Sequence, residues 1–131
     1  MRVMVMVKNL PSGESEAREP EADLAMDRFN EQLINAGVLL AADGLRTSEH
    51  GARVRFEGTK WTVIDGPFTE AKELIAGFWI WQVRSLDEAI EWIRKAPFDG
   101  GREIELRPLH EADDFGSEPA PDRAAVTSRS S

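Results

Sequence analysis

No cysteine occurs among the 131 residues of this sequence. The absence excludes disulfide bonds, thiolate nucleophiles, cysteine-based zinc sites and iron–sulfur ligation, so we expect no disulfide partner. Histidine is also scarce: the sequence has His50 and His110, and neither has a third ligand at a spacing typical of metal sites. We interpret both as loop residues and predict no metal and no other cofactor.

Clusters of basic residues and long apolar runs are lacking as well. The formal net charge is −8, which argues against a nucleic-acid or anionic membrane surface, because binding there needs gathered Lys and Arg. No apolar run approaches the length of a membrane span. The apolar residues 1–7 meet Lys8 too early for a signal-peptide core. We therefore expect a soluble, cytoplasmic protein with one domain.

Hydrophobic periodicity predicts the order of the secondary-structure elements. Alternation of apolar residues indicates strands, and apolar residues at three- to four-residue spacing indicate helices. In chain order we predict a strand at 3–7, a helix at 20–36, an extended segment at 38–47, a hairpin of 53–57 with 61–64, a strand at 78–83, a helix from the capping box of Ser85 and Glu88 to Pro97, and a strand at 103–109.

This order is typical of an α+β fold, a ferredoxin-like antiparallel sheet with two helices on one face and an extra strand or two. We expect Met, Trp and Phe side chains on the other face, which is too apolar to remain in water. A two-fold homodimer through the sheet face would cover it. The domain is expected to span residues 1–110, followed by an acidic, mobile tail at 111–131.

The segment from Asp65 to Glu73, with the sequence Asp-Gly-Pro-Phe-Thr-Glu-Ala-Lys-Glu, gathers ionisable side chains between two predicted strands. An Asp before Gly-Pro would ordinarily accept a hydrogen bond from the N–H two residues on, but Pro67 has none. The Asp65 carboxylate must therefore act elsewhere. With Glu70 and Lys72 it is the candidate for acid–base catalysis, because neighbouring charges displace a carboxyl pKa. The alternative is a capped turn with surface ion pairs.

Four further residues are candidates for contacting a ligand: Phe68, Glu73, Trp79 and Arg107. Trp79 would line an apolar pocket for a planar molecule, or else would pack in the core. Arg107 would clamp a carboxylate, or else would form a salt bridge with Glu105 or Glu73. Carboxylates of the motif holding a hard cation are a minor alternative to the absence of a metal.

The motif and its surroundings resemble the DGPF-domain branch of the YCII-related (YciI-like) proteins. Asp-Gly-Pro-Phe at 65–68 is followed by Glu70, by Lys-Glu at 72–73 and by Gly-Phe at 77–78. The Gly-Val-Leu-Leu block at 37–40, with Gly-Leu at 44–45, and the Glu-Leu-Arg-Pro block at 105–108 resemble other parts of the family, and the similarity covers roughly residues 1–109.

The resemblance implies a dimeric α/β-barrel of ferredoxin-like fold, but no settled reaction. YciI-like relatives carry a His on the first helix and an Asp that together suggest an active site. The predicted helix at 20–36 contains no His, so this pair is not carried over. The frequent association of DGPF members with extracytoplasmic-function sigma factors implies a signalling or stress context.

Two functions remain open from the sequence. The first is a small enzyme or metabolite binder that uses the acidic and Lys cluster in a dimer cleft, with acid–base chemistry on a small organic acid. The second is a non-catalytic dimeric accessory module of a sigma-factor pathway, in which the motif is structural.

Overall fold

The computed structural model describes residues 1–14, 20–98 and 100–115. Its strands and helices are β1 (Arg2–Lys8), α1 (Pro20–Asn35), β2 (Leu39–Gly44), β3 (Ala52–Glu57), β4 (Lys60–Asp65), β5 (Ile75–Gln82), α2 (Leu86–Ile93) and β6 (Ile104–Pro108). Short 3₁₀ turns are η1 (Ser48–His50), η2 (Ala71–Glu73) and η3 (Ala112–Phe115). The predicted order of strands and helices is confirmed, with shifts of up to four residues at the ends, the largest at the end of α2, which was expected to reach Pro97 and ends at Ile93.

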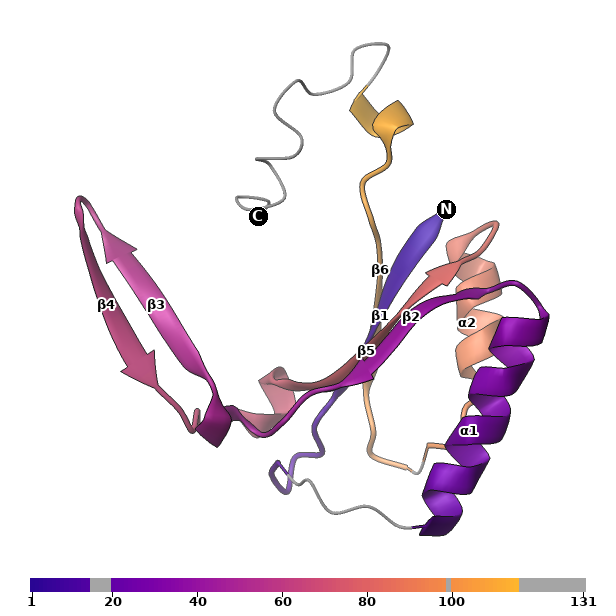
Figure 1. Cartoon of the computed structure of the whole chain (residues 1–131), viewed down its shortest axis with the longest axis horizontal. Helices are drawn as coiled ribbons and strands as arrows, with labels where there is room; N and C mark the ends of the chain where they lie inside the picture. The colour runs from indigo at the N-terminus through magenta and orange to yellow at the C-terminus, as the bar shows by residue number, and fades with distance from the viewer. Residues whose placement is uncertain (15–19, 99, 116–131) are drawn as a thin grey trace.

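Four strands form one antiparallel sheet in the order β2-β5-β1-β6. Both helices lie on the same face of this sheet (Figure 1), as predicted for an α+β fold of ferredoxin-like type. The hairpin of β3 and β4 is inserted between β2 and β5 and forms a separate two-stranded sheet. In Figure 1 it projects from the end of the main sheet, on the side away from the helices.

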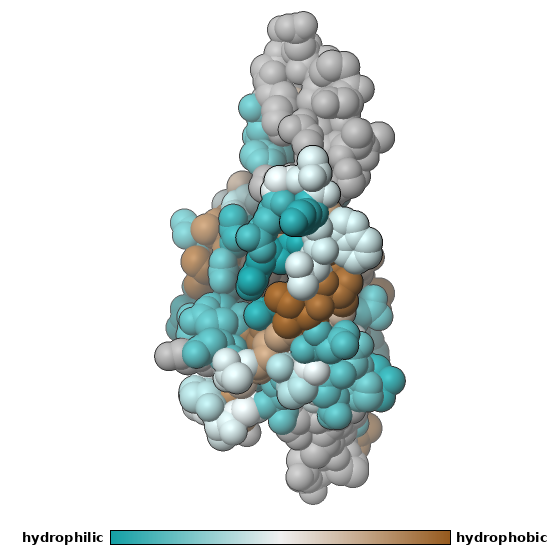
Figure 2. Space-filling view, turned by 90° about the vertical axis from the view of Figure 1, so that its left-hand side faces the viewer, coloured by the Kyte–Doolittle hydropathy of each residue, from teal (hydrophilic) through white to brown (hydrophobic). Residues whose placement is uncertain are grey.

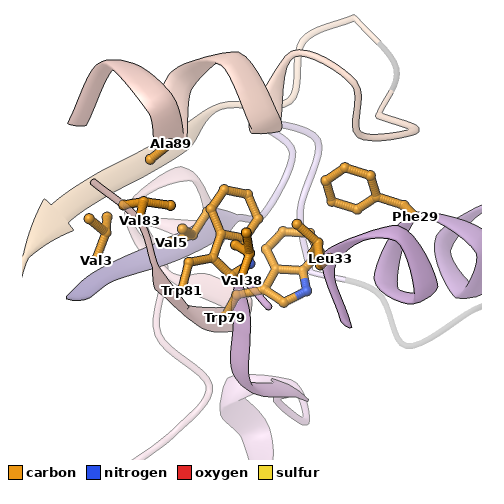
Figure 3. Packing of buried hydrophobic residues seen from close by; sticks show 9 residues of the cluster. All are labelled: Val3, Val5, Phe29, Leu33, Val38, Trp79, Trp81, Val83 and Ala89. Atoms are coloured by element: carbon orange, nitrogen blue, oxygen red, sulfur yellow. The ribbon is translucent and has the colours of Figure 1, made fainter. Parts of the chain in front are cut away.

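The core lies between the sheet and the helices (Figure 3). It contains Trp79 and Trp81 of β5, which are 5% and 0% exposed. The ring centroids of Phe29 from α1 and Trp79 lie 5.7 Å apart in an edge-to-face arrangement. The expectation that tryptophans reach the uncovered face is therefore wrong, because residues two apart on a strand point to the same side and this side packs against the helices.

A capping hydrogen bond begins α2, as predicted. The Glu88 N–H donates to the Ser85 hydroxyl oxygen at 3.1 Å. The reciprocal bond differs from the prediction: the Glu88 carboxylate accepts from the N–H of Arg84, at 2.7 Å, instead of that of Ser85. This backbone hydrogen bond, supported by the Arg84 guanidinium, lowers the pKa of Glu88.

Residues beyond β6 contact the start of the chain. The Glu111 carboxylate accepts from the Arg2 backbone N–H at 3.1 Å and from the Arg2 guanidinium at 3.1 to 3.3 Å. Of the predicted mobile tail, residues 111–115 thus belong to the described structure, and residues 116–131 lie outside it. No helix in the described ranges combines the length and apolarity that crossing a bilayer requires.

Candidate functional site

Small residues leave a hollow at one end of the sheet, on the face that carries the helices. Ala42 and Gly44 of β2 pair with Trp79 and Gly77 of β5, so three of these four positions contribute little or no side chain. A Cβ atom at Gly77 would lie only 3.0 Å from the Asp43 carbonyl oxygen, and a larger residue there would push the strands apart. The result is a cleft of about 700 Å³.

Apolar and aromatic side chains line this cleft. Met26 comes from α1, Val7 from β1, Trp79 from β5 and Phe98 from the segment after α2. The rings of Trp79 and Phe98 meet edge to face, with 6.0 Å between centroids. An apolar or planar body entering the cleft would therefore contact aromatic edges and aliphatic carbon without displacing a buried charge.

Two arginines reach the cleft from segments far apart in the sequence. Arg46 follows β2 and Arg102 precedes β6. Arg102 Nη1 donates to the carbonyl oxygen of Lys8 at 2.8 Å, which holds the guanidinium in place. A guanidinium carries five N–H donors and no acceptor, so this bond leaves donors of Arg102 for a ligand. The charged residues that line the cleft are these two arginines and the exposed Asp43. Cations therefore outnumber the single anion, and in a chain with a net charge of −8 they make this cleft locally favourable to an anion.

Asn30 adds an oriented amide. The indole Nε1 of Trp79 donates to Asn30 Oδ1 at 2.8 Å. Because an indole N–H is a donor only, the bond fixes which end of the amide faces the tryptophan. The Asn30 NH₂ group is left as a further donor in the wall of the cleft.

The Asp-Gly-Pro-Phe turn packs against η1 through a chain of hydrogen bonds. The Glu14 carboxylate accepts from the Ser48 N–H at 2.7 Å and from the Ser48 hydroxyl. The Ser48 hydroxyl oxygen in turn accepts from the Phe68 N–H at 2.9 Å. The Gly66 N–H donates to the Gly51 carbonyl at 3.0 Å, and the peptide bond after Gly66 is cis. The turn is thereby tied to the segment that follows β2.

That segment also carries an arginine of the cleft. Arg46 Nη2 donates to Nε2 of His50, the last residue of η1, at 3.1 Å. Since a guanidinium only donates, Nε2 of His50 is the acceptor in this contact. The Phe68 ring is covered by the Arg53 guanidinium, 3.7 Å from its centroid. The turn therefore supports η1, and η1 supports the position of Arg46.

The three carboxylates predicted in the motif are all exposed. Asp65 ends β4, Glu70 precedes η2 and Glu73 ends it. None of them is among the described residues that line the cleft. The side chain of Lys72 lies outside the described part of the chain, so the structure does not show whether it joins Asp65. Their catalytic roles stay predictions.

Glu73 belongs to an acidic group around Lys8. The Lys8 Nζ lies 3.5 Å from a carboxylate oxygen of Glu103 and 3.5 Å from one of Glu105. Partial burial lowers the pKa of Lys8, but Glu103 and Glu105, helped by Glu73, outweigh it, and the pKa is raised. No three acidic or histidine side chains in residues 1–14, 20–98 and 100–115 are placed to hold a metal ion.

The remaining predicted residues fall in three different places. Arg107 is exposed on β6, and its Nε lies 3.8 Å from a carboxylate oxygen of Glu105, the salt bridge considered as an alternative. Phe68 is half-buried beneath Arg53. Trp79 is the predicted ligand residue that does line the cleft, while it also packs in the core.

Sequence reasoning missed Asn30, Arg46 and Arg102. Strand alternation carried a usable signal for both arginines. Arg102 is two residues before Ile104, which packs against the core, and Arg46 is two residues after Gly44. Positions two apart on an extended chain share a face, so each arginine continues the helix-covered face beyond the end of its strand. Asn30 had no such signal, because polar residues on an amphipathic helix usually face water.

The fold and the cleft define an α+β domain of ferredoxin-like type with a site beside the first helix. The model of the YCII-related domain family matches residues 1–112, and the chain belongs to this family. An uncharacterised protein of Rhizobium meliloti (strain 1021) is 34% identical over 82 residues, which make up 60% of this chain and 64% of that relative. The match thus spans less than two thirds of the relative's length.

Proposed function

We propose that this protein binds a small organic anion, a carboxylate with a planar or apolar body, in the cleft between α1 and the ends of β2 and β5. The observation that carries the proposal is the convergence of Arg46 and Arg102 on one aromatic-walled cleft. Arginine matches a carboxylate in geometry and charge. The Asn30 amide supplies a third donor, held by its bond to Trp79.

The size of the cleft suits such a ligand. Small-molecule sites commonly enclose about 300–1,000 Å³, with apolar walls and a few placed polar groups, and this cleft measures about 700 Å³. Met26, Val7 and Phe98 offer the apolar walls. Its hydrogen-bond donors lie at the two arginines and at Asn30, so the carboxylate would face these donors and away from Asp43, which also lines the cleft, while the body of the ligand contacts the walls.

This proposal moves the ligand away from the acidic and Lys cluster predicted in a dimer cleft. The DGPF turn instead acts on binding through its support of η1 and Arg46. A cytoplasmic location and membership of the DGPF branch stay predictions, and both are compatible with metabolite binding. The alternative, a non-catalytic accessory module of a sigma-factor pathway, predicts a cleft that takes up no ligand.

Thermal unfolding with benzoate and 3-phenylpropanoate tests the proposal, with benzamide as an uncharged control of similar shape. A ligand at 100 times its Kd adds about 2.7 kcal/mol to the free energy of unfolding, which for a domain of this size raises Tm by roughly 8–16 °C. We expect the carboxylates to raise Tm and benzamide to leave it unchanged. Equal shifts with all three, or none with either carboxylate, would contradict the proposal.

Variants make the test specific to the cleft. Asn30→Asp keeps an oxygen to accept the Trp79 N–H but replaces the NH₂ donor by a negative charge, so it should abolish the carboxylate shift without loss of the fold. Arg46→Met should raise the Kd for the carboxylate about tenfold or more, because a charge-assisted hydrogen bond contributes about 1.5–3 kcal/mol. The shift in Tm at a fixed ligand concentration should fall accordingly. Arg84→Met is the matched control: Arg84 is an exposed arginine outside the cleft, and its loss should leave the shift intact.

A further inference from the structure

The two arginines of the cleft come from opposite edges of the main sheet. The strand order of this sheet is β2-β5-β1-β6. Arg46 follows β2, the strand at one edge, and Arg102 precedes β6, the strand at the other edge. Because neighbouring strands lie about 4.8 Å apart, the two backbone positions are separated by roughly 14 Å across the sheet. The cleft therefore has one cation at each of two ends.

Hydrogen bonds hold the two guanidinium groups near these ends. Arg102 Nη1 donates to the carbonyl oxygen of Lys8 at 2.8 Å, and Lys8 is the last residue of β1. Arg46 Nη2 donates to His50 Nε2 at 3.1 Å, and His50 ends η1, which follows β2. The strand between β1 and β2 is β5. Two strand spacings thus separate the groups, a distance of about 10 Å.

The floor between the two ends is built from residues with little side chain. Ala76 and Gly77 of β5 line the cleft there. Gly77 pairs with Gly44 of β2 and with Val7 of β1, so Val7 is the largest residue of the three strands at this level. The aromatic and aliphatic walls already described stand beside this floor. A flat body can therefore lie across the strand ends, from one arginine toward the other.

The acidic residues near the cleft belong to the other face of the sheet. Asp43 lines the cleft, but it pairs with Phe78, which alternates with the buried tryptophans of β5 and also pairs with Met6. Since paired residues share a face and neighbours alternate, the Asp43 side chain is directed to the helix-free face. Glu105 also pairs with Met6 and contacts Lys8 on that face. Among the described residues that line the cleft, no carboxylate is thus directed between the arginines.

The two ends differ in their access to water. The Arg102 residue is half-buried, whereas Arg46 is exposed. The segment that carries Arg46 lies at the base of the hairpin of β3 and β4 (Figure 1). The side from which this hairpin projects is mostly hydrophilic, in teal, around a smaller hydrophobic patch, in brown (Figure 2). An acidic group bound at Arg102 would be enclosed, and one bound at Arg46 would stay in contact with water.

We infer that the ligand of this cleft is a dicarboxylate with a flat or apolar body, one carboxylate bound by Arg102 and the other by Arg46. This inference rests on the proposed function and adds the second acidic group. Each guanidinium offers paired N–H donors that match the two oxygens of a carboxylate. One carboxylate that bridged about 10 Å would give each arginine a single oxygen and leave one positive charge unbalanced. Two carboxylates satisfy both arginines in the positions where their hydrogen bonds hold them.

Isothermal titration calorimetry with matched pairs of probes tests the second acidic group. Terephthalate has a carboxylate at both ends of a planar ring, and 4-carbamoylbenzoate keeps its shape but replaces one carboxylate by an uncharged amide. Naphthalene-2,6-dicarboxylate and its monoamide form a longer pair. We expect the dicarboxylate of at least one pair to bind the wild type with a Kd at least tenfold lower than its monoamide, because it gains a charge-assisted contact.

The outcomes separate this inference from the proposed function. A preference smaller than tenfold in both pairs, with binding of the monoamides, overturns the inference and leaves the proposed function standing. Binding of none of the four probes overturns both. This comparison uses only the wild-type protein, so it does not depend on the folding of any variant.

Variants of the two arginines test which residues bind the two ends. In Arg46→Met and in Arg102→Met one end is lost, so the dicarboxylate should bind no more tightly than its monoamide. The control Arg84→Met changes an exposed arginine outside the cleft and should keep the preference of tenfold or more. A preference that survives either substitution in the cleft overturns the assignment of the second carboxylate to that arginine.

Discussion

A Cβ atom at Gly66 would lie 1.7 Å from the carbonyl oxygen of Ser48. The closeness of these two residues makes glycine in the Asp-Gly-Pro-Phe turn a steric requirement of the fold. It also joins the motif to η1 and, through His50, to Arg46 in the cleft. The motif therefore has a structural task that accounts for its glycine without any catalytic role.

Replacing Gly66 by alanine should destabilise the protein, because the backbone of η1 must move to admit the methyl group. Overpacking of this kind costs about 1–3 kcal/mol, measured as the loss in free energy of urea unfolding. Gly51→Ala is the matched control, since its Cβ would lie 3.5 Å from the same Ser48 oxygen and its φ of −110° is open to any residue. Equal losses in the two variants would contradict the steric explanation.

Replacing Ser48 by alanine should loosen the turn without unfolding the domain. The change removes the hydroxyl oxygen that accepts from the Phe68 N–H, and a lost neutral hydrogen bond costs about 0.5–1.5 kcal/mol. Hydrogen exchange of the Phe68 amide should then be about 2- to 10-fold faster, since 1.4 kcal/mol is a factor of ten. Hydrogen exchange at the core residue Val5 should keep its wild-type rate. An unchanged exchange rate at Phe68 would contradict the prediction.

Replacing Ser85 by alanine should shorten or weaken α2. The Ser85 hydroxyl accepts from the Glu88 N–H at the start of this helix, and loss of an N-cap side chain costs about 1 kcal/mol. For a domain of this size, that corresponds to a fall in Tm of roughly 3–6 °C. Ser85→Asp, which retains a capping oxygen, should have a Tm close to that of the wild type. A loss in Tm as large as that of Ser85→Ala would show that the capping hydrogen bond contributes nothing to stability.

The Arg2–Glu111 contact should make stability depend on pH at the acid end. Side-chain hydrogen bonds from Arg2, then its backbone N–H, lower the pKa of Glu111. A carboxyl whose pKa is lower when folded adds stability above its ordinary pKa of about 4.3 and loses it as pH falls through the folded value.

Thermal unfolding of wild type and Glu111→Gln across pH checks this contact. The variant should have a lower Tm than the wild type at neutral pH. This difference in Tm should disappear as pH falls through the pKa of Glu111 in the folded protein. Both side chains are more than a third exposed, so added salt should reduce the difference at neutral pH. A difference that is the same at every pH would show that the charge of Glu111 is not its cause.

Much of the fold was predictable because its signals are local. The helix at Pro20–Asn35 follows from apolar spacing and from proline at its first position, and the Ser85 cap from a single four-residue pattern. The hairpin at residues 52–65 follows from alternation about Gly58, whose φ of 64° suits a tight turn. Each of these features depends on residues a few positions apart, so the chain encodes it without tertiary contacts.

The partner of Glu88 and the direction of the tryptophans were not predictable in the same way. Glu88 was expected to reach the Ser85 amide, but the Arg84 N–H and guanidinium lie within reach and compete for it. Trp79 and Trp81 lie on the side of β5 that the helices cover. Because both faces of this strand are apolar in the sequence, alternation alone did not indicate which face the helices would cover. In each case the local sequence allowed two alternatives: for Glu88 a neighbouring backbone and side chain decided, and for the tryptophans the packing of the helices decided.

By itself, the sequence determined the order of elements, the exclusion of cysteine chemistry and the family to which the chain belongs. Only the tertiary structure decided which polar groups share a site: it brought Asn30, Arg46 and Arg102 to one cleft, and left Asp65 and Glu70 exposed outside it. The reason is physical. Periodicity reports which face of an element is buried. The meeting of groups 16 to 72 residues apart depends instead on the three strand pairings of the main sheet and on where α1 packs against it.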